Sequence, residues 1–352
     1  MTAPVLRPRT LALITIGCLL LSLLFFAPRL WLMRDYVPGS FQWDRAHTFL
    51  LQCEQPLRRD IEPAMLWRLL PPLVAHTLHL PGRTPLVLPW LGLLALTGYV
   101  AVLHARRLPD AHYVFGGTLL FATTSAALVP VGWLGMNDAW VWLGLLVVAF
   151  GRAQWAVPIA CLLCPWVDER FIIGFPLAWA VARLDRDEPF FDSRVFISLW
   201  LLPYAAVRVA LGGNPATNSV AGGFLAEQVA TVRVMLPLVP LGWWMGLRAG
   251  WLGVAYAGSS LAGSRRLLAG AVLSGTMLVA LLLASDLSRS VAIILPALLL
   301  GGFTLARRWP ETAPRILLGV GCANLLIPAA HVVRTHIDPI NPLLIELYRF
   351  LR

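Results

Sequence analysis

The stretch AMLWRLLPPLVAHTLHL, residues Ala64–Leu80, decides how this chain is laid across a membrane. It is apolar enough to suggest a span, but it is short, contains Pro71-Pro72 and carries Arg68, His76 and His79. Proline removes a backbone donor from a helix interior, and charged groups are costly in the bilayer core. We therefore expect this stretch to form an interfacial helix that lies on the membrane and does not cross it.

The composition of the chain indicates an integral membrane protein. Of its 352 residues, 58% are hydrophobic and only 13% are charged, and the mean hydropathy is +0.73. A soluble domain carries about a quarter charged residues, so too little polar sequence remains here to cover a soluble core. Apolar runs of about 15 to 22 residues recur along the chain, as bilayer-crossing helices require. We expect an all-α membrane protein with one domain over residues 1–352 and about eleven transmembrane helices.

Arginines between the apolar runs set the direction of these spans. Arg7 and Arg9 precede the first span, Leu11–Met33, and are expected to hold the N-terminus in the cytoplasm of a multi-pass protein of the inner or plasma membrane. With Ala64–Leu80 on the surface, residues 34–84 form a long first outer loop, and the later Arg-rich turns fall inside. The segment Trp251–Gly263 is expected on the cytoplasmic side or as a re-entrant segment. The other expected spans are Leu86–Leu103, Ala111–Val131, Ala139–Phe150, Ala153–Trp166, Phe171–Val181, Val195–Leu211, Gln228–Leu247, Leu267–Ala284, Val291–Leu305 and Ile316–His331.

Under this topology, acidic residues and arginines from separate loops share the outer side. Arg208 and Arg233 even lie inside apolar runs near that boundary, where a charge costs a few kcal/mol unless it faces water or a partner. This distribution predicts an outward-facing polar cavity. The candidate substrate-binding residues are His47, Arg68, Asp138, Glu169, Arg170, Arg233, Asp286 and Arg289.

The sequence lacks the patterns that indicate several other classes of site. All 28 basic residues are arginine, but they are scattered between apolar runs, which argues against a nucleic-acid partner. The chain has no nucleophile elbow, zinc-protease motif or phosphate-binding glycine loop. The pair His76-x-x-His79 supplies too few ligands for a zinc site. We assign no metal and no other cofactor, and a requirement for a divalent metal stays open.

One reaction suits acids and arginines gathered at the outer membrane surface. A lipid-linked sugar donor presents its phosphate at the headgroup level with the sugar outside. Transfer of that sugar needs a carboxylate to take a proton from the acceptor hydroxyl. It also needs cations to stabilise the negative charge that grows on the departing lipid phosphate. By their positions, Arg170 and Arg289 are our candidates for contacting the phosphate.

The first outer loop resembles that of the GT-C superfamily of polytopic membrane glycosyltransferases, which use polyprenyl-phosphate sugars. The string Trp43-Asp44-x-x-His47 is similar to the W-D element of some mannosyltransferase members, and Arg68-Leu-Leu-Pro-Pro-Leu resembles an R-x-L-P-P element of bacterial relatives. The resemblance implies that Asp44 is the catalytic base, with Asp35 as the second candidate. The loop departs from the family pattern, because it has no paired acidic motif. We also expect no soluble C-terminal domain of the kind that many members carry, which suggests a small acceptor or a minimal core.

Three alternative functions share the same residues. The first is a transporter or flippase for a lipid-linked or anionic solute, although we find no pair of related halves of the kind that transporters show. The second is a polymerase or ligase of surface polysaccharide, which uses the same donor and makes longer products. The third is a non-catalytic membrane subunit, whose protein partners the sequence does not identify.

Overall fold

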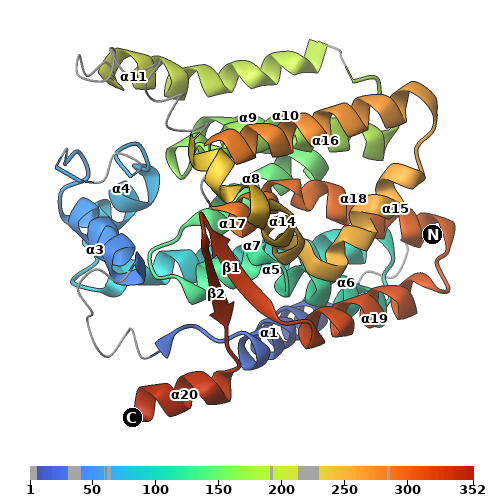
Figure 1. The fold of residues 1–352 in the computed structure, drawn as a ribbon. Coiled ribbons are helices and arrows are strands. Elements are labelled where there is room, and N and C mark those ends of the chain that lie inside the picture. The colour runs from blue at the N-terminus through green and yellow to red at the C-terminus, as the bar shows by residue number, and fades with distance from the viewer. Residues whose placement is uncertain are drawn as a thin grey trace.

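The computed structural model describes residues 6–30, 41–58, 60–61, 65–190, 193–212, 230–283 and 286–352, and within them helices predominate (Figure 1). The helices of the first half are α1 (Pro8–Phe25), α3 (Phe41–Glu54), α4 (Leu70–Thr77), α5 (Val87–Arg107), α6 (Ala111–Ala122), α7 (Ser125–Gly132), α8 (Asp138–Phe150), α9 (Ala156–Leu163) and α10 (Arg170–Arg186). Those of the second half are α11 (Leu202–Gly212), α14 (Val239–Leu247), α15 (Trp251–Ser259), α16 (Gly263–Leu283), α17 (Leu287–Ser290), α18 (Leu295–Arg308), α19 (Ala313–Leu326) and α20 (Leu343–Leu351). Short 3-10 segments adjoin them: η1 (Thr84–Leu86), η2 (Cys164–Trp166), η3 (Ser193–Leu201), η4 (Leu236–Leu238), η5 (Arg248–Gly250) and η6 (Val291–Ile294).

Five helical stretches in the described part of the chain are long and apolar enough to cross a membrane. The bent pair α6 and α7, which meet at 55°, makes a sixth if it counts as one span. The five are Pro8–Phe25, Thr84–Arg107, Ala230–Ser259, Gly263–Leu283 and Leu287–Arg308. These helices agree with the predicted all-α membrane class, while the total of about eleven spans stays a prediction.

Several expected spans are shorter or differently connected in the structure. The helices α8 and α19 and the pair α9–η2 are apolar but fall below spanning length. The segment that begins at Trp251, expected on the cytoplasmic side or as a re-entrant segment, continues the helical stretch Ala230–Ser259. The expected span Ile316–His331 ends as a helix at Leu326 and continues into a strand.

The first-loop segment Ala64–Leu80 contains a helix that is too short to cross a bilayer. α4 has 8 residues, about 12 Å of helix against a hydrocarbon core of about 30 Å. Pro71 and Pro72 lie in its first turn, where a missing N–H leaves no hydrogen bond unmade. His76 anchors α4 to the end of α3, because its Nδ1 lies 3.0 Å from the carbonyl oxygen of Cys53.

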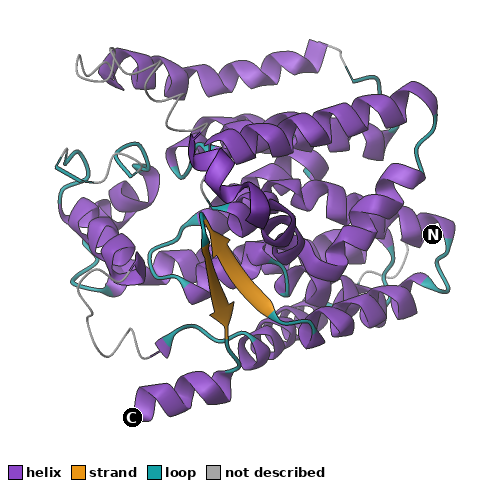
Figure 2. Ribbon diagram, in the orientation of Figure 1, coloured by secondary structure: helices purple, strands orange, loops and turns teal. Residues whose placement is uncertain are grey.

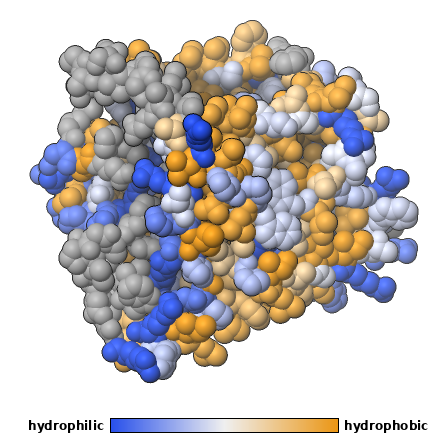
Figure 3. All heavy atoms as spheres, in the orientation of Figure 1, coloured by the Kyte–Doolittle hydropathy of each residue, from blue (hydrophilic) through white to orange (hydrophobic). Residues whose placement is uncertain are grey.

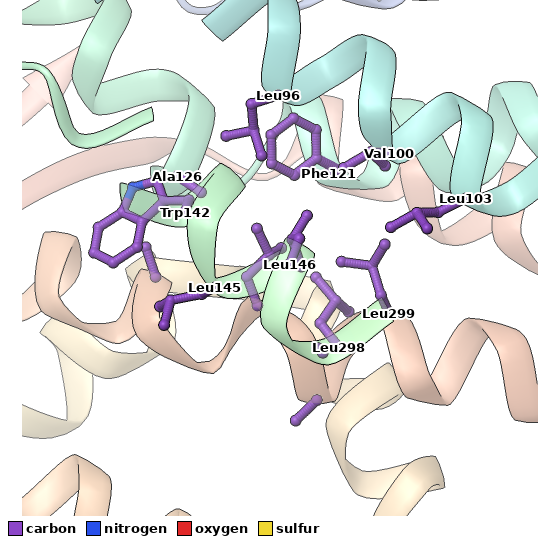
Figure 4. Packing of buried hydrophobic residues seen from close by; sticks show 14 of the residues in the cluster. Leu96, Val100, Leu103, Phe121, Ala126, Trp142, Leu145, Leu146, Leu298 and Leu299 are labelled. Carbon is purple, nitrogen blue, oxygen red and sulfur yellow. The ribbon is translucent and has the colours of Figure 1, made fainter. Parts of the chain in front are cut away.

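The main hydrophobic core lies where α5, α6, α7, α8 and α18 meet (Figure 4). Leu96, Phe121, Trp142 and Leu146 are each at most 1% exposed there. In contrast, α1 and α16 bury only 22% of their most apolar windows. Their exposed leucines, such as Leu13 and Leu267, are the kind of surface that lipid covers.

Two short strands interrupt the helical pattern near the C-terminus (Figure 2). β1 (Ala329–Val333) and β2 (His336–Ile340) pair antiparallel, with Val333 opposite His336. Arg334, in the turn between them, has a φ of 50°. The prediction of an all-helical chain missed this hairpin, because a two-stranded ribbon is stabilised by the surface on which it packs.

Polar residues gather at two opposite ends of the molecule. In the view of Figure 3, hydrophilic atoms concentrate on the left, where α3 and α4 lie, and at the right edge, with an apolar surface between them. The helix α10 connects the two ends: it begins at Arg170 and ends at Arg186. Its 17 residues correspond to about 25 Å, which is most of the thickness of a bilayer core.

Candidate functional site

Three helices begin with an aspartate at the same end of the molecule. Asp138 lies in the first turn of α8, Asp168 precedes α10 by two residues, and Asp286 is the N-cap of α17. The backbone N–H of Arg289 donates to the Asp286 carboxylate at 3.3 Å, and that of Arg170 donates to Asp168 at 3.0 Å. Free N–H groups and the helix dipole stabilise a negative charge at these positions.

The three aspartates and three arginines form one buried network, which we call the Asp–Arg cluster. Its members are Arg68, Asp138, Asp168, Arg170, Asp286 and Arg289. Each aspartate is at most 9% exposed. Equal numbers of opposite charges allow these groups to stay ionised inside the protein.

Asp138 lies between two arginines from different helices. Its carboxylate accepts from Nη2 of Arg170 at 3.1 Å, from Nη2 of Arg289 at 2.6 Å and also from Nε of Arg289. Arg289 in turn contacts Asp286, with 3.3 Å between Nη1 and Oδ2. Asp138 therefore connects the start of α10 to α17.

Asp168 is held by Arg170 and by Arg68 of the first loop. Nε and Nη2 of Arg170 donate to the two carboxylate oxygens at 2.8 and 2.6 Å, and Nη2 of Arg68 lies 3.0 Å from Oδ2. Burial by itself raises the pKa of Asp168, but the guanidinium groups of Arg170 and Arg68 outweigh it and hold the pKa below its usual range. Asp168 is therefore an anion that binds protons weakly.

His331 on β1 extends the network on the far side of Asp286. Its Nε2 lies 3.5 Å from the Asp286 carboxylate, and its Nδ1 lies 3.0 Å from Oγ of Ser288. That same Oγ accepts from the backbone N–H of Val332 at 3.0 Å. The ring also packs against Trp133, with 4.4 Å between ring centroids. Burial lowers the pKa of His331, so the imidazole stays neutral at physiological pH.

A small cavity adjoins the cluster, with Arg68, Asp138, Asp168 and Arg289 in its wall. Its volume is about 10 Å³, room for about one water molecule. First-loop side chains, including Phe49 of α3, close it from the other side. Arg68 Nε and the neighbouring Arg170 Nη1 are buried and have no hydrogen-bond acceptor among the described residues. Charged donors in that state are costly, so the cluster can accept further oxygen ligands.

An apolar groove of about 580 Å³ begins next to this cavity. Pro71 and Val167 line both spaces. The groove continues between α8 and α9 as far as Trp155. Its other lining residues are Leu70, Val74, Leu88, Trp140, Leu143, Gly144, Val147, Ala156, Ile159, Ala160, Leu163 and Cys164. Its size is in the range of ligand pockets, and its wall suits a hydrocarbon chain.

The structure brings together most of the residues that the sequence nominated, but not all. Arg68, Asp138, Arg170, Asp286 and Arg289 lie in the Asp–Arg cluster. Glu169 is at its edge: the side chain is 37% exposed and its Oε2 lies 3.8 Å from Nε of Arg68. The remaining nominees are elsewhere: Asp44, His47 and Arg233 are exposed, and Asp35 lies outside the described residues.

Sequence reasoning did not select Asp168, Ser288 or His331 as site residues, although it noted the string Asp168-Glu169-Arg170. Of the adjacent acids 168 and 169, it chose Glu169, whereas Asp168 is the one that is buried, 2% exposed. Both acids lie at the N-terminus of an apolar helix, where a negative charge is stabilised, so this sequence signal did not distinguish them. Nothing local marked His331, because the hairpin that delivers it was not predicted.

The described residues contain no group of three or more His, Cys, Asp or Glu side chains that could hold a metal ion. The carboxylates of the Asp–Arg cluster are neutralised by arginines instead. Comparison with known proteins gives no further identification: no family model, curated protein or solved structure matches this chain.

Proposed function

We propose that this protein transfers a sugar from a polyprenyl-phosphate donor to an acceptor at the non-cytoplasmic face of the inner or plasma membrane. The observation that carries the proposal is the junction of the buried Asp–Arg cluster with the apolar groove at Pro71 and Val167. A lipid phosphate needs cationic donors for its head and an apolar surface for its chain. The two spaces offer these side by side.

In this proposal, Arg68 and Arg289 hold the departing phosphate, since both line the cavity next to the groove. Arg170 does not line it and keeps Asp138 and Asp168 in place. The resemblance of the Arg68-Leu-Leu-Pro-Pro-Leu segment to the GT-C element supports a functional role for Arg68. A cavity of about 10 Å³ is too small for a sugar, so donor binding requires the first-loop residues that cover it to move.

The proposed base is Asp44. Its carboxylate is exposed and makes no ion pair with the described residues, whereas Asp168 is held in a weakly basic form by two arginines. The following residues of α3 approach the turn before α8: a Cβ on Gly135 would lie 3.2 Å from Cα of Ala46. In the reaction, the acceptor oxygen bonds to the anomeric carbon as the bond from that carbon to the phosphate oxygen breaks. The acceptor proton passes to Asp44, and the electron pair stays on the lipid phosphate.

The test uses the purified full chain in nanodiscs, with undecaprenyl-phosphate carrying a radiolabelled hexose and a membrane extract as the source of acceptor. Asp44→Asn should lower transfer by about 10²–10⁴-fold, the typical contribution of a general base, without changing donor binding. Arg68→Gln should weaken donor binding, because a phosphate contact is lost. The matched controls are Glu54→Gln on the same helix and Arg58→Gln in the same loop.

Each result has a definite meaning. Full activity of Asp44→Asn removes Asp44 from the mechanism, and unchanged donor binding by Arg68→Gln removes Arg68. If both controls lose activity to the same degree, the effects are not specific to the site. Movement of the labelled donor across the bilayer of proteoliposomes with no covalent product replaces the proposal with a flippase.

The proposal includes a multi-pass topology of about eleven spans with a cytoplasmic N-terminus. It is supported by the arginines at the end of the molecule opposite the Asp–Arg cluster. Arg106 and Arg107 end α5, Arg183 and Arg186 lie in the last turn of α10, and Arg308 ends α18. Short cytoplasmic turns are enriched in such residues.

A further inference from the structure

A second polar cavity lies at the opposite end of α10 from the Asp–Arg cluster. Its volume is about 460 Å³. The loop after α8, the last turns of α10 and the 3-10 segment η3 enclose it. The lining residues are Val148, Gly151, Arg152, Ala153, Gln154, Val157, Trp179, Ala182, Arg183, Arg186, Arg194 and Ile197. We call this space the arginine pocket.

Four arginines line the arginine pocket, and none of its lining residues is acidic. Glu188 lies beside it and pairs with two of the four, at 2.7 Å from Arg183 and 2.9 Å from Arg194. The C-termini of α8 and α10 contribute about half a negative charge each. Together these negative charges balance about two of the arginines. Arg152 and Arg186 make no ion pair with the described residues, so positive charge remains in excess.

The pocket also has the fixed geometry of a binding site. Arg183 is 1% exposed, and its guanidinium lies over the ring of Trp179, 4.0 Å from the centroid. Arg186 donates from Nη2 to the carbonyl oxygen of Gly151 at 2.7 Å. These contacts hold two guanidinium groups from the last turn of α10 in place, and Arg152 adds a third, exposed arginine to the lining. Pre-positioned cations lose less conformational entropy when a ligand binds.

We infer that the arginine pocket binds a phosphate group that carries an organic substituent. Guanidinium groups suit phosphate because they donate in parallel pairs, and the apolar wall of Val148, Val157, Trp179 and Ile197 provides a surface for the attached group. The volume lies within the range of small-molecule sites. The phosphate belongs either to the headgroup of an anionic phospholipid or to a soluble compound. This site is about 25 Å from the proposed sugar-transfer site and does not depend on that proposal.

The test measures two probes on the purified full chain. The first probe is inorganic phosphate, and its binding is measured by isothermal titration calorimetry in detergent. The second probe is phosphatidylglycerol in nanodiscs that otherwise contain phosphatidylcholine. Native mass spectrometry measures how much phosphatidylglycerol the protein retains. The variant is Arg152→Gln with Arg186→Gln, because both side chains are exposed and their loss leaves the Arg183–Glu188 pair intact. The control is Arg106→Gln with Arg308→Gln, two exposed arginines that do not line the pocket.

We expect the pocket variant to bind at least one probe about tenfold more weakly, since a hydrogen bond to a charged group contributes about 1.5–3 kcal/mol. A loss confined to phosphatidylglycerol identifies a lipid headgroup, and a loss confined to inorganic phosphate identifies a soluble ligand. Equal binding by wild type, variant and control overturns the inference. An equal loss in the control also overturns it, because the effect is then one of net charge. A thermal unfolding midpoint is recorded for each protein to establish that the variants are folded.

Discussion

At the scale of single residues, the Asp–Arg cluster depends on mutual neutralisation. Asp138 and Asp168 are buried, yet each contacts at least two guanidinium groups. Removing one partner from such a network leaves an uncompensated charge and costs about 3–5 kcal/mol. Replacing buried ion pairs by apolar side chains of similar volume is often neutral or stabilising. Stability alone therefore does not explain the presence of this network.

His331 gives the cluster a dependence on pH with a definite sign. Burial lowers its pKa in the folded protein, while the unfolded chain has a value of about 6.5. Below pH 6.5 the unfolded state therefore binds more protons at this residue than the folded state, and stability is lost as the pH falls. Between pH 7.5 and 5.5, wild type should lose more stability than His331→Asn, by up to about 1 kcal/mol. The measurement is the thermal unfolding midpoint in detergent at both pH values.

The control for this prediction is His336→Asn on the paired strand. His336 is exposed, so its variant should keep the pH dependence of wild type. If His331→Asn and wild type lose the same stability on acidification, the imidazole of His331 is not held neutral by burial.

At the scale of elements, the position of the site depends on where helices begin and on how helices pack against one another. The helices α8, α10 and α17 all begin at the cluster, so their N-termini share the stabilisation of its carboxylates. Behind them, α18 packs closely on α15, because glycines face each other at Gly253 and Gly301. Small residues at such crossings let helix backbones approach in membrane proteins.

The contact between α15 and α18 predicts a strong effect of one methyl group. A Cβ on Gly301 would lie 2.6 Å from the backbone carbonyl carbon of Gly253 and would overlap its oxygen. The backbone cannot rotate away as a side chain can, so Gly301→Ala should destabilise the protein by about 1–3 kcal/mol. The matched control, Gly270→Ala on α16, has no atom within 4 Å of the new Cβ and should be neutral or slightly stabilising. Thermal unfolding in detergent distinguishes the two, and equal midpoints would show that the helices separate freely.

At the scale of the whole molecule, two polar ends are separated by an apolar band. The Asp–Arg cluster with α3 and α4 occupies one end, and the arginine pocket the other. Because α10 joins them over about 25 Å, the two ends match the two surfaces of a bilayer. This arrangement makes the sidedness of the protein measurable.

The proposed topology predicts the accessibility of two exposed positions. In a background without the five native cysteines, His47→Cys should react with a membrane-impermeant maleimide on intact cells. Arg308→Cys, at the end of α18, should react only after permeabilisation. The unsubstituted background provides the blank. The reverse pattern would place the Asp–Arg cluster on the cytoplasmic side and remove the outward-facing site.

The sequence identified most residues of the Asp–Arg cluster but not which of their side chains point inward. Asp138, Arg170 and Asp286 stand out because each interrupts or precedes an apolar run, and burying a charge there requires a partner. Sequence alone could not choose between Asp168 and Glu169, because only the direction of the first turn of α10 decides which carboxylate points inward. The first-loop nominee His47 is exposed for the same kind of reason: α3 turns Ala46 and Phe49 toward the protein.

By itself, the sequence determined the helical membrane class, the non-crossing first-loop segment and the charged residues of the cluster, since these follow from hydrophobicity, proline and the cost of buried charge. Only the tertiary structure decided which charges pair, because residues 68, 138, 168 and 289 are far apart in the chain and meet through helix packing. It also decided the β1–β2 hairpin, the apolar groove beside the cluster and the arginine pocket at the far end. Each of these is a space or a contact between elements, which no local pattern of residues encodes.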